Sequence, residues 1–441
     1  MRDHASKLIG KVRDVAPEGT FAVGAGLAVA AATAYVFVIV ALNSLGEGGE
    51  TAFGLFWSFI FVAGPGLFLP LEQEVGRALA HRRAQGLGGK PLVVRAARLG
   101  GILTAALVVI VIATSPLYIE RFDDDWLLVA SLAVGLVGFY CMHTVRGTLS
   151  GNARFRPYGE MLATEGAVRL GAAIVLTSLG ANTAGAYGMC IALAPFAAVL
   201  FALRKQHGLL TPGPPAPYSE LSNALGWLLA GSVLMQLLAY SSLLGINFLE
   251  SSTGKAAAAA FTSAFFVARI PVLLFQAVQG TLLPKLANLA GAGRHDDFRT
   301  GFKQLLLVVV GIAGIGTLAA FAIGPAAGKI LFEDFTIDNL DLGLLALGSG
   351  IFIVALTIAQ ALIALHGHRT VTFAWGVGVL GFLIGTAAID RLPLRVEVGF
   401  VVGSTLATAV MAAALIGRMR KGVSESIDSL ITAIGHEPLE L

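Results

Sequence analysis

FAVGAGLAVAAATAYVFVIVALN, residues 21–43, is a run without a single charged side chain. It is long enough to cross a bilayer as one helix, which takes about 20 residues. A signal peptide that is later removed would have a shorter apolar core and a small-residue cleavage site. This run follows a polar leader, residues 1–20, and lacks such a site, so we expect it to be a retained helix.

Eleven further apolar runs follow when the chain is read with a window of about 19 residues. The twelve predicted spans are residues 21–43, 52–71, 99–118, 126–149, 157–178, 184–203, 225–249, 256–283, 302–323, 340–365, 371–389 and 396–416. The second and eighth can extend as amphipathic helices, to about residues 80 and 290. The sequence therefore predicts an all-α polytopic membrane protein with about twelve transmembrane helices.

The composition excludes a water-soluble protein. Of 441 residues, 56% are hydrophobic and only 13% are charged, with a mean hydropathy of +0.80. Soluble domains carry about twice that share of charge. The spans leave no room for a folded catalytic domain, and no metal-ligand or phosphate-loop motif occurs. We therefore predict no enzyme activity, no cofactor or metal, and no nucleic-acid partner. Cys141 and Cys190 fall inside predicted spans, which excludes a disulfide framework.

The distribution of basic residues predicts the orientation. Of the 30 Lys and Arg residues, 22 fall in segments on the same side as the N-terminus and 5 on the other side. The loop of residues 120–125, ERFDDD, is acidic instead. Because cytoplasmic loops carry the excess of Lys and Arg, we expect both chain termini to lie inside.

The two halves of the chain resemble each other. Residues 42–45, LNSL, correspond to residues 246–249, INFL, and the second span of each half contains proline. Six crossings return the chain to the same side, so the repeat is parallel. We predict two pseudo-symmetric six-helix lobes in a V around a central cleft. The boundaries are residues 1–203 for the first lobe, 204–221 for a Pro-rich cytoplasmic linker, 222–416 for the second lobe and 417–441 for an amphipathic tail. Pro65, Pro70 and Pro271 are the candidate hinges.

Charged side chains inside spans are the first candidates for a site, because a lipid-facing charge costs at least about 2.5–3.5 kcal/mol. Arg269 lies well inside the eighth span, where it could bind phosphate oxygens or cap helix carbonyls. Glu165 and Arg169 are four residues apart on one helix, which suits an intrahelical ion pair as well as a place in the cleft. We expect Glu72, Glu74 and Arg77 at the membrane interface, and His143 and Arg146 snorkelling toward it.

Neutral polar residues mark the spans that head the two halves. Residues 21–43 and 225–249 contain no carboxylate, whereas an exporter of cationic drugs would need a buried acid there. Their polar groups include Asn43, Gln236, Tyr240 and Asn247. Together with Arg269, Arg169 and Glu165, these residues form the predicted cavity for an anionic, hydroxyl-rich substrate.

Two segments carry a resemblance to a known family. Residues 265–271, FFVARIP, and 280–286, GTLLPKL, resemble the eighth helix of lipid-linked glycan flippases. Residues 53–80, with GPG at 64–66 and LEQE at 71–74, are similar to the second span of polysaccharide transporters. The chain thus resembles the polysaccharide-transporter (Wzx-like) family of the multidrug/oligosaccharidyl-lipid/polysaccharide (MOP) exporter superfamily, which also includes MATE transporters and lipid II flippases.

The resemblance implies alternating access and a cationic cavity for a polyprenyl-pyrophosphate glycan. Arg269 matches a cavity arginine of the lipid II flippases. The first span lacks the arginines of that branch, and an extra C-terminal pair of spans is absent, which favours the polysaccharide branch. The implied partners are the polyprenyl-linked glycan, membrane lipids, and glycosyltransferases or a polymerase of the same pathway. The implied location is the cytoplasmic membrane of a bacterium.

The predicted function is therefore translocation of a polyprenyl-linked saccharide from the inner to the outer leaflet for cell-envelope synthesis. Arg269, with Arg169, would take the pyrophosphate, and Glu165 is the candidate proton carrier. Two alternatives stay open. One is a cation-coupled exporter of small molecules with the same fold, and the other is a non-transporting scaffold that recruits envelope-synthesis enzymes.

Overall fold

A computed structural model of the protein describes residues 20–221, 225–249, 255–270, 272, 295–332, 335–365 and 367–421. These residues form twelve α-helices and three short 3₁₀ helices, and no strand occurs among them. Eleven of the α-helices are long and apolar enough to cross a membrane. The predicted all-α polytopic fold is confirmed, with helix ends that differ from the predicted spans by several residues.

The first six helices pack together as one lobe, which we call the N-lobe. They are α2 (Thr20–Ser44), α3 (Glu47–Ala84), α4 (Lys90–Thr114), α5 (Trp126–Gly151), α6 (Phe155–Ser178) and α7 (Ala184–Ala202). Helix α2 packs on α6, and α5 lies between α3 and α7. The α2–α6 contact is close because Gly26 faces Gly159, where an added Cβ on Gly26 would lie 2.2 Å from the Gly159 carbonyl oxygen. Helix α3 runs through Pro65 and Pro70 without interruption.

The remaining helices form the C-lobe. They are α8 (Leu225–Leu249), α9 (Lys255–Val267), α11 (His295–Leu331), α12 (Asn339–Ala364), α13 (His368–Ala387) and α14 (Leu394–Lys421). Helix α14 packs between α12 and α13, α11 packs on α12, and α8 packs on α13.

The eighth span differs from its prediction. The sequence predicts one helix over residues 256–283, but α9 ends at Val267. Beyond it the chain turns, since Arg269 N–H bonds to the Phe266 carbonyl oxygen and Val272 N–H bonds to that of Arg269. Arg269 therefore sits on a turn rather than inside a straight helix. The predicted hinge Pro271, residues 273–294 and the predicted amphipathic tail beyond residue 421 lie outside the described residues.

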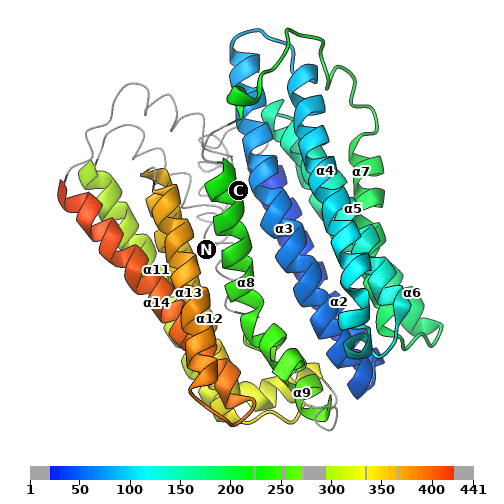
Figure 1. Cartoon of the computed structure of the whole chain (residues 1–441), viewed down its shortest axis with the longest axis vertical. Helices are drawn as coiled ribbons and strands as arrows, with labels where there is room; N and C mark the ends of the chain where they lie inside the picture. The colour runs from blue at the N-terminus through cyan, green and yellow to red at the C-terminus, as the bar shows by residue number, and fades with distance from the viewer. Residues whose placement is uncertain are drawn as a thin grey trace, which may run out of the picture.

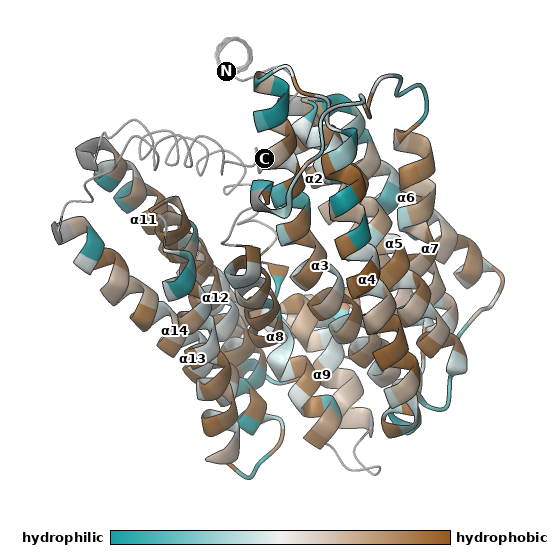
Figure 2. Cartoon of the chain, turned by 45° about the horizontal axis from the view of Figure 1, so that its top comes forward, coloured by the Kyte–Doolittle hydropathy of each residue, from teal (hydrophilic) through white to brown (hydrophobic). Residues whose placement is uncertain are grey.

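The two lobes meet along α3, which packs against α8 and α9. Figure 1 shows α3 and α8 side by side at the centre, with the lobes diverging toward one end of the molecule. Hydrophilic residues gather at the two ends of the helices and hydrophobic residues cover their middles (Figure 2). This distribution fits a protein whose helices cross a bilayer.

The diverging end carries the linker, residues 204–221, and we call it the linker end. Here the linker docks on α3: Arg82 donates to both carboxylate oxygens of Glu220, at 3.0 and 2.8 Å, and to the Pro214 carbonyl oxygen. The backbone N–H of Lys90 bonds to the Thr211 carbonyl oxygen at 2.9 Å. The acidic loop predicted to lie outside, residues 120–125, is at the opposite end.

Candidate functional site

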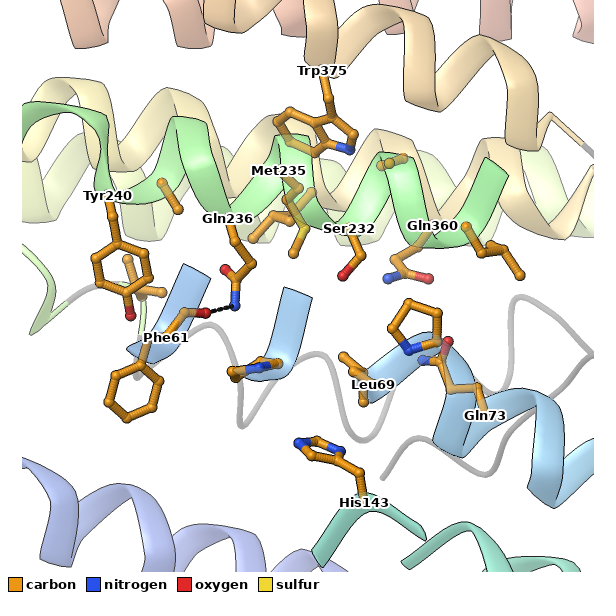
Figure 3. Close-up of a pocket in the computed structure, with 18 of the residues that line it drawn as sticks. Phe61, Leu69, Gln73, His143, Ser232, Met235, Gln236, Tyr240, Gln360 and Trp375 are labelled. Atoms are coloured by element: carbon orange, nitrogen blue, oxygen red, sulfur yellow. Dashed lines mark hydrogen bonds between the residues drawn. The ribbon is translucent and has the colours of Figure 1, made fainter. Parts of the chain in front are cut away.

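A cavity of about 720 Å³ lies between the lobes. Helices α2, α3, α5 and α6 line one wall, and α8, α12, α13 and the end of α9 line the other. Figure 3 shows side chains of α3 and α5 facing those of α8 across this space. The lining extends from Tyr240 and Phe266, deep between the lobes, to Arg77 and His368 at the linker end.

The cavity is closed at the end opposite the linker by contacts between the lobes. Arg121 of the N-lobe donates to the carbonyl oxygens of Asn247 and Phe248, at the end of α8. Asn43 Nδ2, on α2, donates to the Leu331 carbonyl oxygen of α11 at 2.9 Å. The cavity therefore extends from its deep, closed end toward the linker end.

Arg269 lies at the deep end of the cavity, in an environment that the sequence did not indicate. Its guanidinium faces four aromatic rings at 4.5–6.0 Å from their centroids: Phe265, Tyr240, Phe352 and Phe400. It also donates to the Ala239 carbonyl oxygen. Within the described part of the chain, no carboxylate lies at salt-bridge distance from it, and its Nε has no hydrogen-bond partner. The charge is stabilised by ring faces rather than by an anion.

Glu165 and Arg169 also line the cavity, and they form the intrahelical pair that their spacing allows. Arg169 Nη1 lies 2.8 Å from Glu165 Oε1, and both side chains are at most 10% exposed. The guanidinium lies over the Phe37 ring at 5.6 Å from its centroid. The pair is therefore neutral as a unit, which removes Arg169 as an unpaired cation in this conformation.

The predicted neutral polar residues divide into two groups. Gln236 and Tyr240 line the cavity, and Gln236 Nε2 donates to the Phe61 carbonyl oxygen at 3.1 Å (Figure 3). Asn43 and Asn247 do not line it, because they lie near the closed end. Asn247 Nδ2 instead bonds to the Leu243 carbonyl oxygen on its own helix at 2.7 Å.

A buried polar network at the N-lobe wall was not predicted. Glu72 accepts hydrogen bonds from Tyr158 at 2.8 Å and from His143 Nδ1 at 2.6 Å, and Arg146 lies 3.2 Å away. Glu72 is only 5% exposed. The expectation that His143 and Arg146 snorkel is therefore wrong, whereas the depth of Glu72 in a membrane stays a prediction. These groups from α3, α5 and α6 satisfy one another, so they need not reach water.

Further amide groups on the lining were also missed. Gln73 on α3 and Gln360 on α12 line the cavity, as does Ser232 of α8 (Figure 3). Trp375 of α13 adds an aromatic face. Glutamine is unusual inside apolar helices, and that composition alone could have drawn attention to residues 73 and 360.

The charge on the lining is smaller than predicted. Four arginines line the cavity, and three of them have a carboxylate partner: Arg77 with Glu74, Arg146 with Glu72, and Arg169 with Glu165. Arg269 is the fourth. The wall thus presents amides, aromatic rings and one arginine without a carboxylate partner in the described residues, rather than a broadly cationic surface.

The relatives found for the chain carry the name of uncharacterized proteins. No family model matches the chain. Two curated relatives from Mycobacterium tuberculosis (strain ATCC 25618 / H37Rv) are similar. Uncharacterized protein Rv3630 is 28% identical over 400 residues, covering 86% of this chain and 87% of the relative. Uncharacterized protein Rv1510 is 27% identical over 442 residues, covering 95% and 98%.

Solved structures give the fold more directly. The inward-facing conformation of a multidrug resistance MATE family transporter of the MOP superfamily matches with a TM-score of 0.70 at 16% identity, covering 89% of this chain and 96% of that one. A mutant of the Vibrio cholerae MATE transporter VcmN matches with a TM-score of 0.67 at 16% identity, covering 92% and 97%. The chain therefore has the MATE transporter fold, as predicted.

Proposed function

We propose that the protein is a membrane transporter that moves a polyprenyl-(pyro)phosphate-linked saccharide from the inner to the outer leaflet by alternating access. The cavity lies between two lobes, is closed at one end and extends toward the other. A transporter with a central site needs this arrangement, and rocking of one lobe against the other would reverse which end is closed.

The observation that carries the choice of substrate is the environment of Arg269. A guanidinium held by ring faces keeps donor hydrogens for a phosphate, with which arginine forms paired hydrogen bonds. Its Nε has no partner among the described residues, so binding an anion would satisfy a donor that is otherwise buried without one.

The rest of the lining supports a saccharide next to that phosphate. The side-chain amides of Gln73, Gln236 and Gln360 each offer both donors and acceptors, which suits sugar hydroxyl groups. The prenyl chain would remain in lipid between the lobes. Helices α2 and α8 head the two halves and carry no carboxylate, so they place no repelling charge beside the phosphate.

A second candidate is an exporter of flat, cationic small molecules, and the aromatic lining favours it. Trp57, Phe61, Tyr240 and Trp375 all face the cavity, and ring faces attract organic cations. One solved structure with this fold is of a multidrug transporter. The two candidates differ in the sign of the ligand charge.

Binding of a soluble polyprenyl-pyrophosphate glycan analogue to the purified protein tests the proposal. Wild type should bind saturably, more weakly as salt is added, and Arg269→Ala should lose binding. Arg156→Ala is the matched control, because Arg156 is 83% exposed and pairs with Glu160 outside the cavity. Equal binding by Arg269→Ala and wild type would remove Arg269 from the site.

Two further outcomes would favour the alternatives. Saturable binding of an aromatic cation, with none of the glycan analogue, would support the exporter. A cell in which Arg269→Ala leaves polysaccharide output unchanged at equal protein level would support the scaffold.

A further inference from the structure

Two buried carboxyl groups lie together in the C-lobe, far from the linker end. Asp341 is in the first turn of α12 and Glu397 in the first turn of α14. Their exposed fractions are 7% and 0%, and their carboxyl groups lie within hydrogen-bonding reach of each other. Neither oxygen of Glu397 accepts a hydrogen bond from any described donor.

The charged groups near the pair do not neutralise it. Asp338, the N-cap of α12, adds a further carboxylate and accepts from Asp341 N–H at 2.9 Å. Arg391, in the connection before α14, is the cation that acts on both acids, yet no basic side chain of the described residues lies within 4 Å of either carboxylate. Helix α11, which packs on α12, has one basic side chain in its last turn, Lys329, and this side chain is not within 4 Å of either carboxylate.

The other packed helices bring no counter-charge. Helix α8 has no acidic or basic side chain, and those of α13 are His368 and Arg369, at the linker end. The buried acids of the N-lobe differ in this respect, because Glu72, Glu74 and Glu165 each have an arginine partner. Asp341 and Glu397 are thus the buried acids without one in the described residues.

Such a pair is stable with one proton between its members. Two buried carboxylates in contact repel each other strongly, so one of them takes up a proton. Both lie at helix N-termini, where backbone N–H groups favour one negative charge. A protonated Glu397 would donate to Asp341 and so satisfy the oxygens that otherwise lack a partner.

We infer that Asp341 and Glu397 share one proton and form the site where the transporter takes up and releases the proton that accompanies substrate movement. On uptake, a proton from water adds to a Glu397 carboxylate oxygen, and the resulting O–H donates to Asp341. On release, the same O–H bond breaks and the pair regains its second negative charge. The site itself stands on the packing of α12 and α14, and only its coupling to transport rests on the proposed function.

A short path connects the pair to the cavity. Phe400 lies one turn along α14 from Glu397, and its ring is one of the four around Arg269, at 6.0 Å. The same ring packs on Gly348 of α12, where an added Cβ would lie 2.5 Å away. A change in charge that shifts α12 against α14 therefore reaches the ring beside Arg269. Ser404, two turns from Glu397, is fully buried, and its hydroxyl lacks a partner among the described residues.

This assignment moves the proton site away from Glu165, its predicted carrier. Glu165 holds Arg169 at 2.8 Å, so its charge is already compensated. Glu165→Gln is therefore the matched control: it removes a buried carboxyl of the same chain that has a cationic partner.

Infrared difference spectroscopy of the purified full chain tests the shared proton without any substrate. A C=O stretch of a protonated carboxylic acid should be present at neutral pH and disappear on raising the pH. Glu397→Gln should lose this band completely, and Glu165→Gln should keep it. The glutamine amide can donate to Asp341 as the protonated acid does, so we expect this variant to fold. A band absent from wild type, or present in Glu397→Gln, would overturn the assignment.

A second measurement tests the coupling. In vesicles with an imposed pH gradient, Glu397→Gln should lose the gradient-dependent part of transport of the glycan analogue while still binding it. Transport that keeps its pH dependence would overturn the coupling but leave the spectroscopic result standing. A band that disappears on adding sodium at fixed pH would identify a sodium site instead and would also overturn the inference. If the wild-type protein does not bind the glycan analogue, that result contradicts only the proposed function.

Discussion

Gln236 on α8 donates its side-chain N–H to the carbonyl oxygen of Phe61 on α3, at 3.1 Å, and the bond joins the two lobes inside the cavity. This carbonyl lacks its helical donor because the residue four positions further along α3 is a proline. Proline has no N–H, so Pro65 cannot make the helical hydrogen bond to residue 61. The proline thus leaves a carbonyl acceptor in the N-lobe without its helical donor, and the side chain of Gln236 in the C-lobe donates to it.

The C-lobe contains a second carbonyl of this kind, left without its helical donor by a proline and bonded by a side-chain amide. Pro325 lies inside α11 and leaves the carbonyl of Phe321 without its helical donor. Asn339 Nδ2, at the start of α12, bonds to that oxygen at 2.6 Å. In both cases a side-chain amide from a neighbouring helix replaces the missing N–H.

The interlobe hydrogen bond leads to a first prediction. Gln236→Leu should destabilise the protein by about 1–3 kcal/mol, because it leaves the Phe61 carbonyl oxygen buried and unpaired. In a Pro65→Ala background the same substitution should cost less, since the backbone N–H that this change introduces can donate to that carbonyl. Chemical unfolding of the four variants in detergent gives the coupling energy of the cycle. Additive effects would show that the bond contributes nothing beyond each residue alone.

Arg121 is expected to favour the conformation that is closed opposite the linker. Arg121→Gln removes its charged hydrogen bonds to the end of α8 and should shift the population toward opening there by about tenfold, as about 1.5 kcal/mol implies. Spin labels at Trp126 and Leu340, exposed residues of the two lobes, report the distance between them. Cys141 and Cys190 must first be replaced. An unchanged distance distribution would argue against this role for Arg121.

The network around Glu72 should be sensitive to the loss of its carboxylate. Glu72→Gln removes the buried carboxylate that pairs with Arg146 and should lower the unfolding free energy by about 3–5 kcal/mol. Replacing Arg146 by Met in the same chain should recover much of that loss. Tyr158→Phe removes one neutral donor and should cost only about 1 kcal/mol. If Tyr158→Phe lowers the unfolding free energy as much as Glu72→Gln does, the charge of the Glu72 carboxylate does not account for the stability of the network.

The docked linker gives a prediction that limited proteolysis can check. Arg82 is 2% exposed and holds Glu220 by both oxygens and Pro214 by its carbonyl. Arg82→Ala should release the linker and speed cleavage after Arg204 and Lys205. Arg82→Lys should not restore resistance, because an ammonium cannot reproduce the paired geometry. Restored resistance in Arg82→Lys would show that charge alone holds the linker.

Much of the fold is predictable from the sequence because a bilayer imposes strong requirements. Each spanning helix needs an uninterrupted apolar run, and such runs are visible without knowledge of the packing. The largest errors occur where apolarity does not set the helix end. Helix α3 continues to Ala84 because polar residues beyond Leu71 find partners in other helices. Helix α9 ends at Val267 although the sequence stays apolar.

The candidate site was only partly predictable for a related reason. Arg269, Gln236 and Tyr240 stand out in the sequence because polar groups in spans are rare, and all three line the cavity. Asn43 and Asn247 are also polar residues in spans. However, they lie near the ends of α2 and α8, which are at the closed end of the cavity. The partners of Glu72 come from α5 and α6, and no pattern within a single helix indicates such contacts. The proline–carbonyl pairs could have been anticipated, because the orphaned acceptor follows from the position of the proline alone.

The docked linker also fixes the mechanics of the covalent connection between the halves. Its residues from Thr211 to Glu220 are held on the N-lobe, so only residues 221–224 of the chain separate the anchored segment from the start of α8. A connection this short limits how far the two lobes can separate at the linker end. If the C-lobe rotates against the N-lobe, we expect the rotation axis to lie beside α3, with the largest displacement at the ends of α11 and α14 that are farthest from it.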